Sequence, residues 1–477
     1  MDGILELREK LDNGSISTDE LFSNSIDMAK KSQDKYNSFV TIMENYEKVD
    51  SKSLISGIPY ALKDNVSTKG ILTTGSSNVL AKYVPVYDAT IYKQLKASGA
   101  VLMGKTVLDE LAIGGTGTTG HTGTVHNPWD SSRQIGGSSA GSAAAVALGI
   151  VPFAIGSDTG DSIRKPAAFG GVVGFKPTYG RISRYGLFAF ASSLDHLGVF
   201  TRSVRDAAIV TDIVKGHDNH DMTSLPNDNL EYSKLIDNDV KGRKLFYIKE
   251  ALENHDNDLE MNKIINNFKE VIEKCKSLGI EVCEESLDKD LLRAMYPTYK
   301  AISCAEVTSN DANLTGIHFG VRREGNTPDE IIANARTKGF SELIKRRFVL
   351  GSYILQKENQ EKLFLNACRV RRMIVNKVNE LFEKYDGIIM PASEMIAPKL
   401  DYEPDILSDR YLILGNHLVI GNFGGYPSIT IPSGFVDNMP VAINITGRIK
   451  EDAVVLNIAN KIEGSMEYAN QIAKEME

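Results

Sequence analysis

Two glycine-rich turns that carry serine are the stretches of this 477-residue chain best suited to chemistry. The first, GGSSAGS, contains Ser138, Ser139 and Ser142, and the second, GSDTGDSIR, contains Ser157 and Ser162. Glycine lets a backbone turn tightly and approach a ligand closely. A serine hydroxyl in such a turn is a candidate nucleophile when a base lies within hydrogen-bond reach, and otherwise it only shapes the turn.

Two kinds of base are available. Lys63 follows the apolar run 58–62, and burial there would disfavour its charge, so that a neutral amine could act as a base near pH 7. The alternative for Lys63 is a solvated strand end. The histidines near the serines are His121, His126 and His196, and none belongs to a G-x-S-x-G turn. A Ser–His–Asp triad is therefore a second possibility, but no sequence motif supports it.

The residues before Ser162 suggest how a developing negative charge could be stabilised. If a helix begins at Ser162, its first N–H groups have no partner within the helix. Donors of this kind stabilise an oxyanion by roughly 3 kcal/mol each. The second turn thus combines a nucleophile with candidate oxyanion donors.

One helix and one strand must position the two turns. Small residues over 143–149 predict the helix, and 151–155 predict a buried strand. A parallel α/β arrangement would bring both turns to one edge of a sheet. The patterns also predict helices over 1–50 (with a capping box at Ser17 and Glu20), 88–98, 106–112, 203–214, 258–278 and much of 325–385, and strands at 58–62, 101–103, 172–175, 245–248, 280–283, 387–390, 428–431 and 441–446.

Composition narrows the class of protein. The 54 basic and 62 acidic residues give a net charge of −8, which argues against this chain gripping a nucleic-acid backbone by itself. The four cysteines form no C-x-x-C pair, which is typical of a reduced, intracellular protein. No apolar run approaches the length of a membrane span, and the N-terminus lacks the features of a targeting segment. We therefore expect a cytoplasmic protein with no membrane association.

One motif is a decoy. Residues 99–106, GAVLMGKT, fit the P-loop formula, but the four residues between the glycines form an apolar run that favours a strand. A helix precedes them, where a P-loop requires a strand. We interpret this stretch as a helix–strand corner. Metal-ligand spacings such as HExxH are absent from the sequence, so we expect no metal site.

Three stretches together resemble the amidase signature family: GIPYALKDN around Lys63, GGSSAGSAAAVA, and GSDTGDSIRKPAAFGGVVGFKPTYGRISRYGL. The resemblance covers nearly the whole chain. It implies an α/β/α fold in which helices cover both faces of a large mixed sheet. It also implies a Ser–cisSer–Lys triad with Ser162 as nucleophile, Ser138 as bridging serine after a cis Gly137–Ser138 bond, and Lys63 as base. The oxyanion donors would be the N–H groups of Thr159, Gly160, Asp161 and Ser162.

Within the family, DNVSTKGILTTGSS, FAFASSLDHLG, AEVTSN and NFGGYPSITIP are most similar to the glutamine-hydrolysing subunits of tRNA-dependent amidotransferases. This implies that the chain releases ammonia from glutamine and works with partner subunits B and C. The partner would bind the tRNA and would use ATP and Mg²⁺, so this chain itself needs no cofactor. The alternatives are a free-standing serine amidase for small amides and a scaffold subunit without activity.

Three departures from the family pattern concern the substrate site. Asp161 stands where the family has glycine, and Lys165 stands where it has glutamine. Because these residues are four apart, we hypothesise that they form a helical ion pair, so that Lys165→Gln alone would cost more activity than changing both. The family's acid for the substrate's amino group should fall within 414–416, where the chain has no acid.

The resemblance also implies a substrate-binding role for Arg347 and Tyr299. A solvated helix face is the alternative for Arg346 and Arg347. It further implies two regions: an N-terminal helical region (1–55) packed on an amidase-signature domain (56–477). That domain would have its signature core at about 57–206 and a helical insertion at about 250–385.

Overall fold

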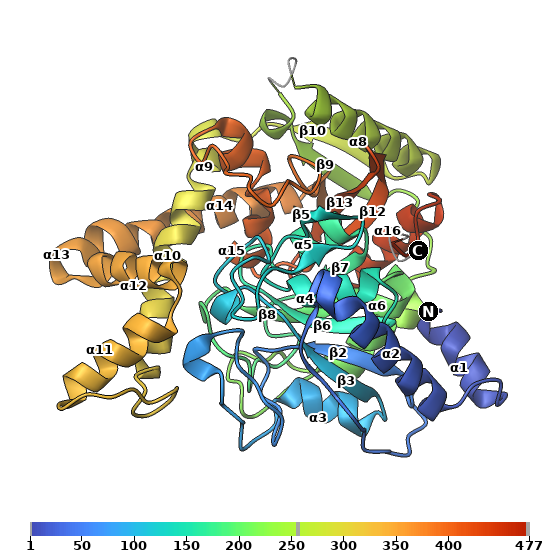
Figure 1. Cartoon of the computed structure of the whole chain (residues 1–477). Helices are drawn as coiled ribbons and strands as arrows, with labels where there is room; N and C mark the ends of the chain where they lie inside the picture. Colours follow the sequence, from blue (N-terminus) through green and yellow to red (C-terminus); the bar gives the residue numbers. More distant parts are fainter. Residues whose placement is uncertain (1, 254–257, 474–477) are drawn as a thin grey trace.

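An eleven-stranded mixed sheet runs through the centre of the chain (Figure 1). The computed structural model describes residues 2–253 and 258–473. β2 pairs in parallel with both β3 and β6, and β9 pairs in parallel with both β10 and β11. In sheet order the strands are β1 (Phe39–Ile42), β3 (Val101–Thr106), β2 (Pro59–Lys63), β6 (Phe153–Asp158), β8 (His196–Thr201), β7 (Val173–Lys176), β12 (Ser428–Val436), β13 (Met439–Gly447), β11 (Gly387–Pro391), β9 (Lys244–Ile248) and β10 (Glu281–Glu285).

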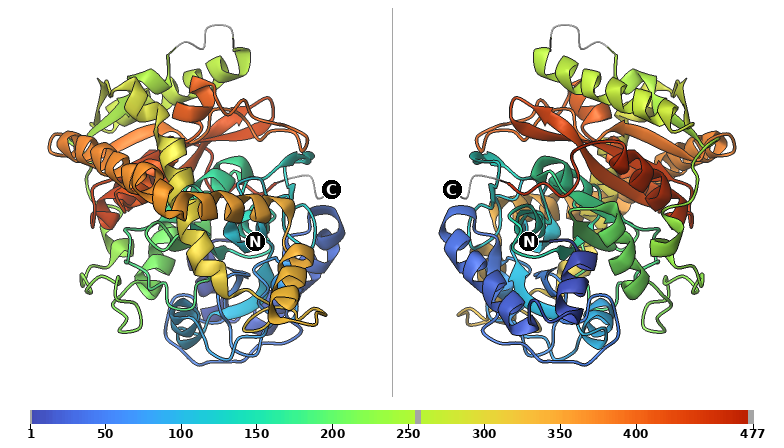
Figure 2. Two further views of the ribbon diagram at one scale, coloured as in Figure 1. Left: turned by 90° about the vertical axis from the view of Figure 1, so that its left-hand side faces the viewer. Right: turned by 90° about the vertical axis from the view of Figure 1, so that its right-hand side faces the viewer.

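Helices cover both faces of this sheet, as predicted (Figure 2). Neighbouring residues of one strand point to opposite sides. In β2, Leu62 packs with the apolar cluster of α3, α6 and α16, whereas Ala61 packs with α2 and α4. In β6, Ile155 packs with the same cluster as Leu62, and Ala154 packs with the same cluster as Ala61. Strands buried on both faces explain why their sequences are nearly continuous apolar runs.

The remaining elements complete these layers. A separate hairpin joins β4 (His126–Asn127) to β5 (Asp130–Gln134). The helices are α1 (Ile4–Asp12), α2 (Thr18–Tyr36), α3 (Thr90–Ala97), α4 (Ala140–Ala147), α5 (Arg164–Gly170), α6 (Val204–Val214), α7 (Tyr232–Leu235), α8 (Leu259–Ser277), α9 (Lys289–Arg293), α10 (Met295–Asn310), α11 (Pro328–Gly339), α12 (Glu342–Leu355), α13 (Lys357–Gln360), α14 (Asn366–Phe382), α15 (Ile420–Phe423) and α16 (Asp452–Gly464).

The structure shows where the N-terminal helices and the predicted helical insertion lie relative to the sheet. The N-terminal helices contact the core, since Ile4 of α1 is buried and donates its N–H to Asp206 at 3.2 Å. Helices α11, α12 and α13 extend away from the sheet on the left of Figure 1. The division at residue 55 itself stays a prediction. None of the helices in residues 2–253 and 258–473 has the length and apolar character of a membrane span.

Most predicted elements are confirmed, but three predictions are wrong. Residues 106–112 are not a helix: β3 continues to Thr106, and the short turn 110–112 contains Leu111 in a left-handed conformation with φ of 53°. Residues 1–50 are not all helical, because β1 pairs with β3. The patterns predict no strand between 175 and 245, yet β8 lies in the middle of the sheet.

Candidate active site

Lys63 is the last residue of β2, and its amine is completely buried. Its Nζ lies 2.8 Å from Oγ of Ser138, 2.8 Å from Oγ of Ser139 and 2.9 Å from Oγ of Ser157. Burial lowers the pKa of Lys63 from 10.5 to about 7, although the charges of Asp109, Asp158 and Asp195 act in the opposite direction. The solvated alternative for this lysine is therefore wrong, and a neutral amine is available near pH 7.

The two serine turns meet beside this amine. Ser138 follows a cis Gly137–Ser138 bond and precedes α4, while Ser162 lies between β6 and α5. The N–H of Ser139 donates to the carbonyl of Ser162 at 3.2 Å. Ser138 and Ser162 are 1% and 4% exposed. The expected juxtaposition of the two turns at one sheet edge is thus present.

The loop between β6 and α5 presents backbone donors. Within the described residues, the N–H groups of Thr159, Gly160, Asp161 and Ser162 donate to no protein acceptor. The next N–H, that of Ile163, donates to Asp158 at 2.9 Å. The open donors are therefore those of the four residues that the family resemblance assigns to the oxyanion site.

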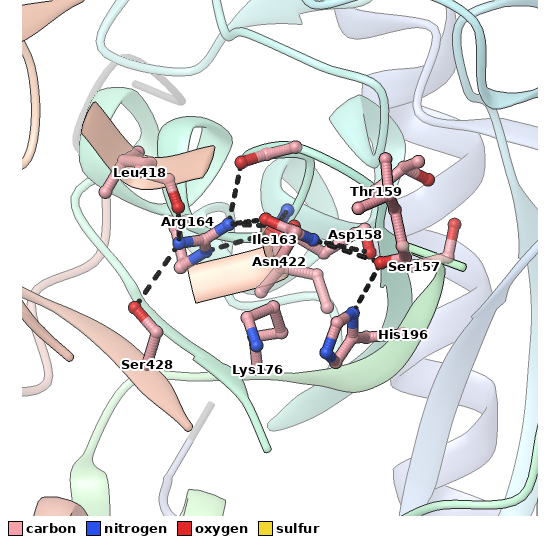
Figure 3. Close-up of polar contacts among 12 residues, drawn as sticks. Ser157, Asp158, Thr159, Ile163, Arg164, Lys176, His196, Leu418, Asn422 and Ser428 are labelled. Carbon is pink, nitrogen blue, oxygen red and sulfur yellow. Dashed lines mark hydrogen bonds and ion pairs between the residues drawn. The ribbon is translucent and has the colours of Figure 1, made fainter. Parts of the chain in front are cut away.

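A buried arginine fixes the shape of this loop (Figure 3). The guanidinium of Arg164 donates to both carboxylate oxygens of Asp158 at 3.1 and 2.9 Å, and to the carbonyl of Gly160 at 2.8 Å. It also donates to Asn422 at 2.6 Å. Burial would raise the pKa of Asp158, but the charge and hydrogen bonds of Arg164 and the charge of Lys176 outweigh burial and lower it well below its usual range. Asp158 therefore stays ionised and holds both ends of the loop.

The histidine alternative gains no support from the geometry. Nδ1 of His196 lies 2.6 Å from the carbonyl of Leu194, and Nδ1 of His126 lies 2.6 Å from the carbonyl of Ser131. Burial lowers the pKa of His196 well below 6.5. In the described part of the chain, neither Ser138 nor Ser162 makes a hydrogen bond with a histidine.

The sequence did not predict the contacts of several supporting residues. Ser139 and Ser157 both contact the amine of Lys63, and Asn65 donates to Ser157 at 3.0 Å. The carboxylate of Asp109 accepts N–H groups from residues 116–119, which folds the glycine-rich segment onto the serines. A Cβ on Gly137 would lie 1.9 Å from Asp109, so this close approach requires glycine. The only sequence signal for these supporting residues is the high density of glycine and serine in the segments around them.

Tyr299 and Arg347 lie near the same loop. A Cβ on Gly160 would lie 3.0 Å from the ring of Tyr299, so this ring of α10 packs directly on the oxyanion loop. Arg347 of α12 lies 3.7 Å from Sγ of Cys304 through Nη1, and its buried Nε has no hydrogen-bond partner in the described residues. Arg346 is exposed and contacts the carbonyl of Glu342, which fits the solvated alternative for that residue.

Comparison with known proteins decides the family. The sequence profile described as Amidase matches residues 20–456. The chain belongs to the amidase family. This amidase is 40% identical over 473 residues to the A subunit of glutamyl-tRNA(Gln) amidotransferase from Heliobacterium modesticaldum, with 96% of the chain and 95% of that protein covered. It is 37% identical to the protein of the same name from Lactobacillus delbrueckii, with 98% and 96% covered. The crystal structure of the same subunit from Thermotoga maritima superimposes with a TM-score of 0.82 at 34% identity, with 98% and 96% covered.

The hypothesis that Lys165 of this amidase pairs with Asp161 is wrong. Nζ of Lys165 donates to the carboxylate of Glu394 at 2.8 Å and to the carbonyl of Gly415 at 3.3 Å. The backbone keeps the helical spacing, since the N–H of Lys165 donates to the carbonyl of Asp161, but the amine of Lys165 is engaged by Glu394 and not by the Asp161 carboxylate. The side chains of Lys165 and Glu394 are only 8% and 9% exposed, so the ion pair is largely dry.

We expect Lys165→Gln to lower the free energy of unfolding at pH 7 by about 3 kcal/mol, because it leaves the Glu394 carboxylate buried without its cation. The double variant Lys165→Gln/Glu394→Gln should recover most of this loss. Urea unfolding of the three proteins measures both changes. A loss below about 1 kcal/mol, or a double variant no more stable than the single one, would contradict the assignment.

The same pair gives the amidase a predictable pH response. Burial would raise the pKa of Glu394, but the charge and hydrogen bond of Lys165 outweigh burial and lower it below 4.5. A lowered pKa means that this contribution to stability is complete above pH 4.5 and is lost as the pH falls through the lower value of the folded protein.

The stretch that fits the P-loop formula forms a strand of the sheet, in agreement with its interpretation as a helix–strand corner. Residues 101–106 form β3, and Lys105 donates to the carbonyl of Val66 at 2.7 Å and to Thr73 at 2.9 Å. Among the residues that the structure describes, no group of three or more potential metal ligands gathers. A cavity of about 700 Å³ lies between α1, the start of α2 and residues 48–57, and none of the serine-site residues lines it.

Proposed function

We propose that this amidase is the glutamine-hydrolysing subunit of a tRNA-dependent amidotransferase that converts Glu-tRNA(Gln) to Gln-tRNA(Gln). The observation that carries this proposal is the match, over nearly the whole chain, to subunits of such enzymes at 37% and 40% identity. The buried amine beside Ser138 supports the chemistry, because a neutral lysine is the base that such an amidase needs.

The proposed reaction uses the groups in the roles that the family resemblance assigns to them. Oγ of Ser162 attacks the side-chain amide carbon of glutamine, and its proton passes through the hydroxyl of Ser138 to the neutral amine of Lys63. The open N–H groups of residues 159–162 stabilise the oxyanion. As the C–N bond breaks, the proton returns from Lys63 to the leaving nitrogen and ammonia departs. Water then attacks the acyl-enzyme ester, giving glutamate and regenerating Ser162.

The relatives' names, which are those of A subunits of amidotransferases, support the proposed partners. Subunits B and C would complete the enzyme, and the partner would bind the charged tRNA, ATP and Mg²⁺ and receive the ammonia. The net charge of −8 fits a chain that leaves the tRNA to its partner. A cytoplasmic location would follow from this role in protein synthesis.

Ammonia release from glutamine tests the proposal. The chain should be assayed alone and then with subunits B and C, ATP and Glu-tRNA(Gln) added one at a time. We expect turnover to rise with each addition and glutamine to be the preferred amide. Equal turnover of simple aliphatic amides by the chain alone, unchanged by subunits B and C, would instead establish a free-standing amidase. No turnover in any combination would favour the scaffold alternative.

A further inference from the structure

Asp161 immediately precedes the proposed nucleophile and is half-buried, whereas the other residues of 157–165 are buried. It therefore lies where the loop of Ser162 meets solvent. Within the described residues, its carboxylate makes no hydrogen bond and no ion pair, although its carbonyl accepts the N–H of Lys165 at 2.8 Å. Burial raises the pKa of Asp161 to about 6, so the carboxylate is mostly ionised at pH 7.

The other acid near this site is already engaged. The carboxylate of Glu394 accepts from Lys165 at 2.8 Å and from the hydroxyl of Ser393 at 3.2 Å. A Cβ on Gly415 would lie 3.0 Å from Oε1 of Glu394, so this carboxylate also fills the space beside Gly415. The segment 414–416, where the family resemblance locates an acid, thus offers no anion of its own. Asp161 is the carboxylate that keeps its hydrogen-bonding capacity.

Arg347 is a nearby cation whose hydrogen-bonding capacity is not fully used. The ring of Tyr299 packs on Gly160, the residue before Asp161 in the loop. Burial raises the pKa of the Tyr299 hydroxyl, while the charge of Arg347 lowers that pKa and the charge of Asp161 raises it. The Nε of Arg347 is buried and has no partner in the described residues. One anion and one cation with open hydrogen-bonding groups therefore lie near Tyr299, beside Ser162. This arrangement complements the ammonium and carboxylate groups of an α-amino acid.

We propose that the carboxylate of Asp161 binds the α-ammonium group of the amide substrate and so selects α-amino-acid amides over amides that lack this group. This inference rests on the proposed glutaminase function. Arg347 would bind the α-carboxylate at the other end. The residue that departs from the family's glycine is then a specificity-determining residue and does not impair the oxyanion site.

The test compares two substrates that differ only in the ammonium group: L-glutamine and glutaric acid monoamide. We expect Asp161→Asn to lower kcat/KM for glutamine about 30-fold, because a charge-assisted hydrogen bond is lost, mostly through KM. For glutaric acid monoamide, kcat/KM should change less than about 3-fold, because that substrate never used the carboxylate. Asp329→Asn, an exposed change in α11 far along the chain, is the matched control and should alter neither value.

The outcomes separate this inference from the function on which it rests. Equal losses on both substrates would show that Asp161 acts on the oxyanion loop, and would overturn the inference while glutaminase activity stands. An unmodified enzyme that hydrolyses neither substrate would overturn the proposed function and this inference with it. If Asp161→Asn is inactive, calorimetry in a Ser162→Ala background compares glutamine binding with and without Asp161→Asn. Equal affinities there would also overturn the inference.

Discussion

Ser162→Ala is expected to lower glutamine turnover at least ~10⁴-fold, because it removes the oxygen that forms the acyl-enzyme. Ser162 is 4% exposed, and the structure gives its hydroxyl no hydrogen bond within the described residues. Loss of the hydroxyl should therefore leave stability within about 0.5 kcal/mol of the unmodified protein. Ammonia release measures the first effect, and urea unfolding measures the second.

Ser142→Ala is the matched control. Ser142 lies in the first serine turn, but its hydroxyl bonds the carbonyl of Ile155 and lies 2.7 Å from Thr106, away from the amine of Lys63. Removing it should cost stability and leave turnover per folded molecule nearly unchanged. If Ser162→Ala retains more than a tenth of the activity, or if Ser142→Ala loses as much, Ser162 is not the nucleophile.

Lys63→Met is expected to lower turnover about 10³-fold, because the proton of the serine then has no base to accept it. The methionine keeps most of the side-chain volume and removes the amine. Because burial disfavours the charged form of Lys63, replacing the lysine breaks no stable ion pair. The protein should therefore stay folded. Activity and thermal unfolding should be measured on the same preparation.

Lys105→Met separates chemistry from folding. Lys105 is also fully buried, in the neighbouring parallel strand β3, and burial lowers its pKa to about 8. Its amine lies 3.7 Å from the carboxylate of Asp64 and contacts none of the serines of the site. Lys105→Met should destabilise the fold, because Asp64 loses its cation, but should spare turnover per folded molecule. If Lys63→Met spared turnover and Lys105→Met abolished it, the assignment of Lys63 as the base would be wrong.

Sequence reasoning located the site better than it described its surroundings. The apolar run before Lys63 and the glycine–serine turns are local features, so the strand, the turns and their juxtaposition could be predicted. Burial of Lys63 depends on Ser138, Ser139 and Ser157 closing over its amine, and no local pattern encodes that closure. The function and the family came from the extended resemblance.

The failures have a common physical cause, which is pairing between segments far apart in the chain. β3 extends to Thr106 because it pairs with β1 and β2, whereas propensity alone favoured a helix from that residue. Lys165 contacts Glu394, which is 229 residues away, although a closer acid lies at the helical spacing. β8 is central because two antiparallel neighbours enclose it, despite its irregular sequence.

The pH dependence of kcat/KM for glutamine tests the central claim, a neutral amine at Lys63, most directly. Because burial lowers the pKa of Lys63 to about 7, the active form predominates above that pH, and the rate should fall tenfold per pH unit below it. The account predicts an acidic limb with a midpoint near 7, retained in Asp161→Asn. A midpoint near 10.5, or a profile whose single acidic limb lies near 6 and disappears in Asp161→Asn, would contradict it.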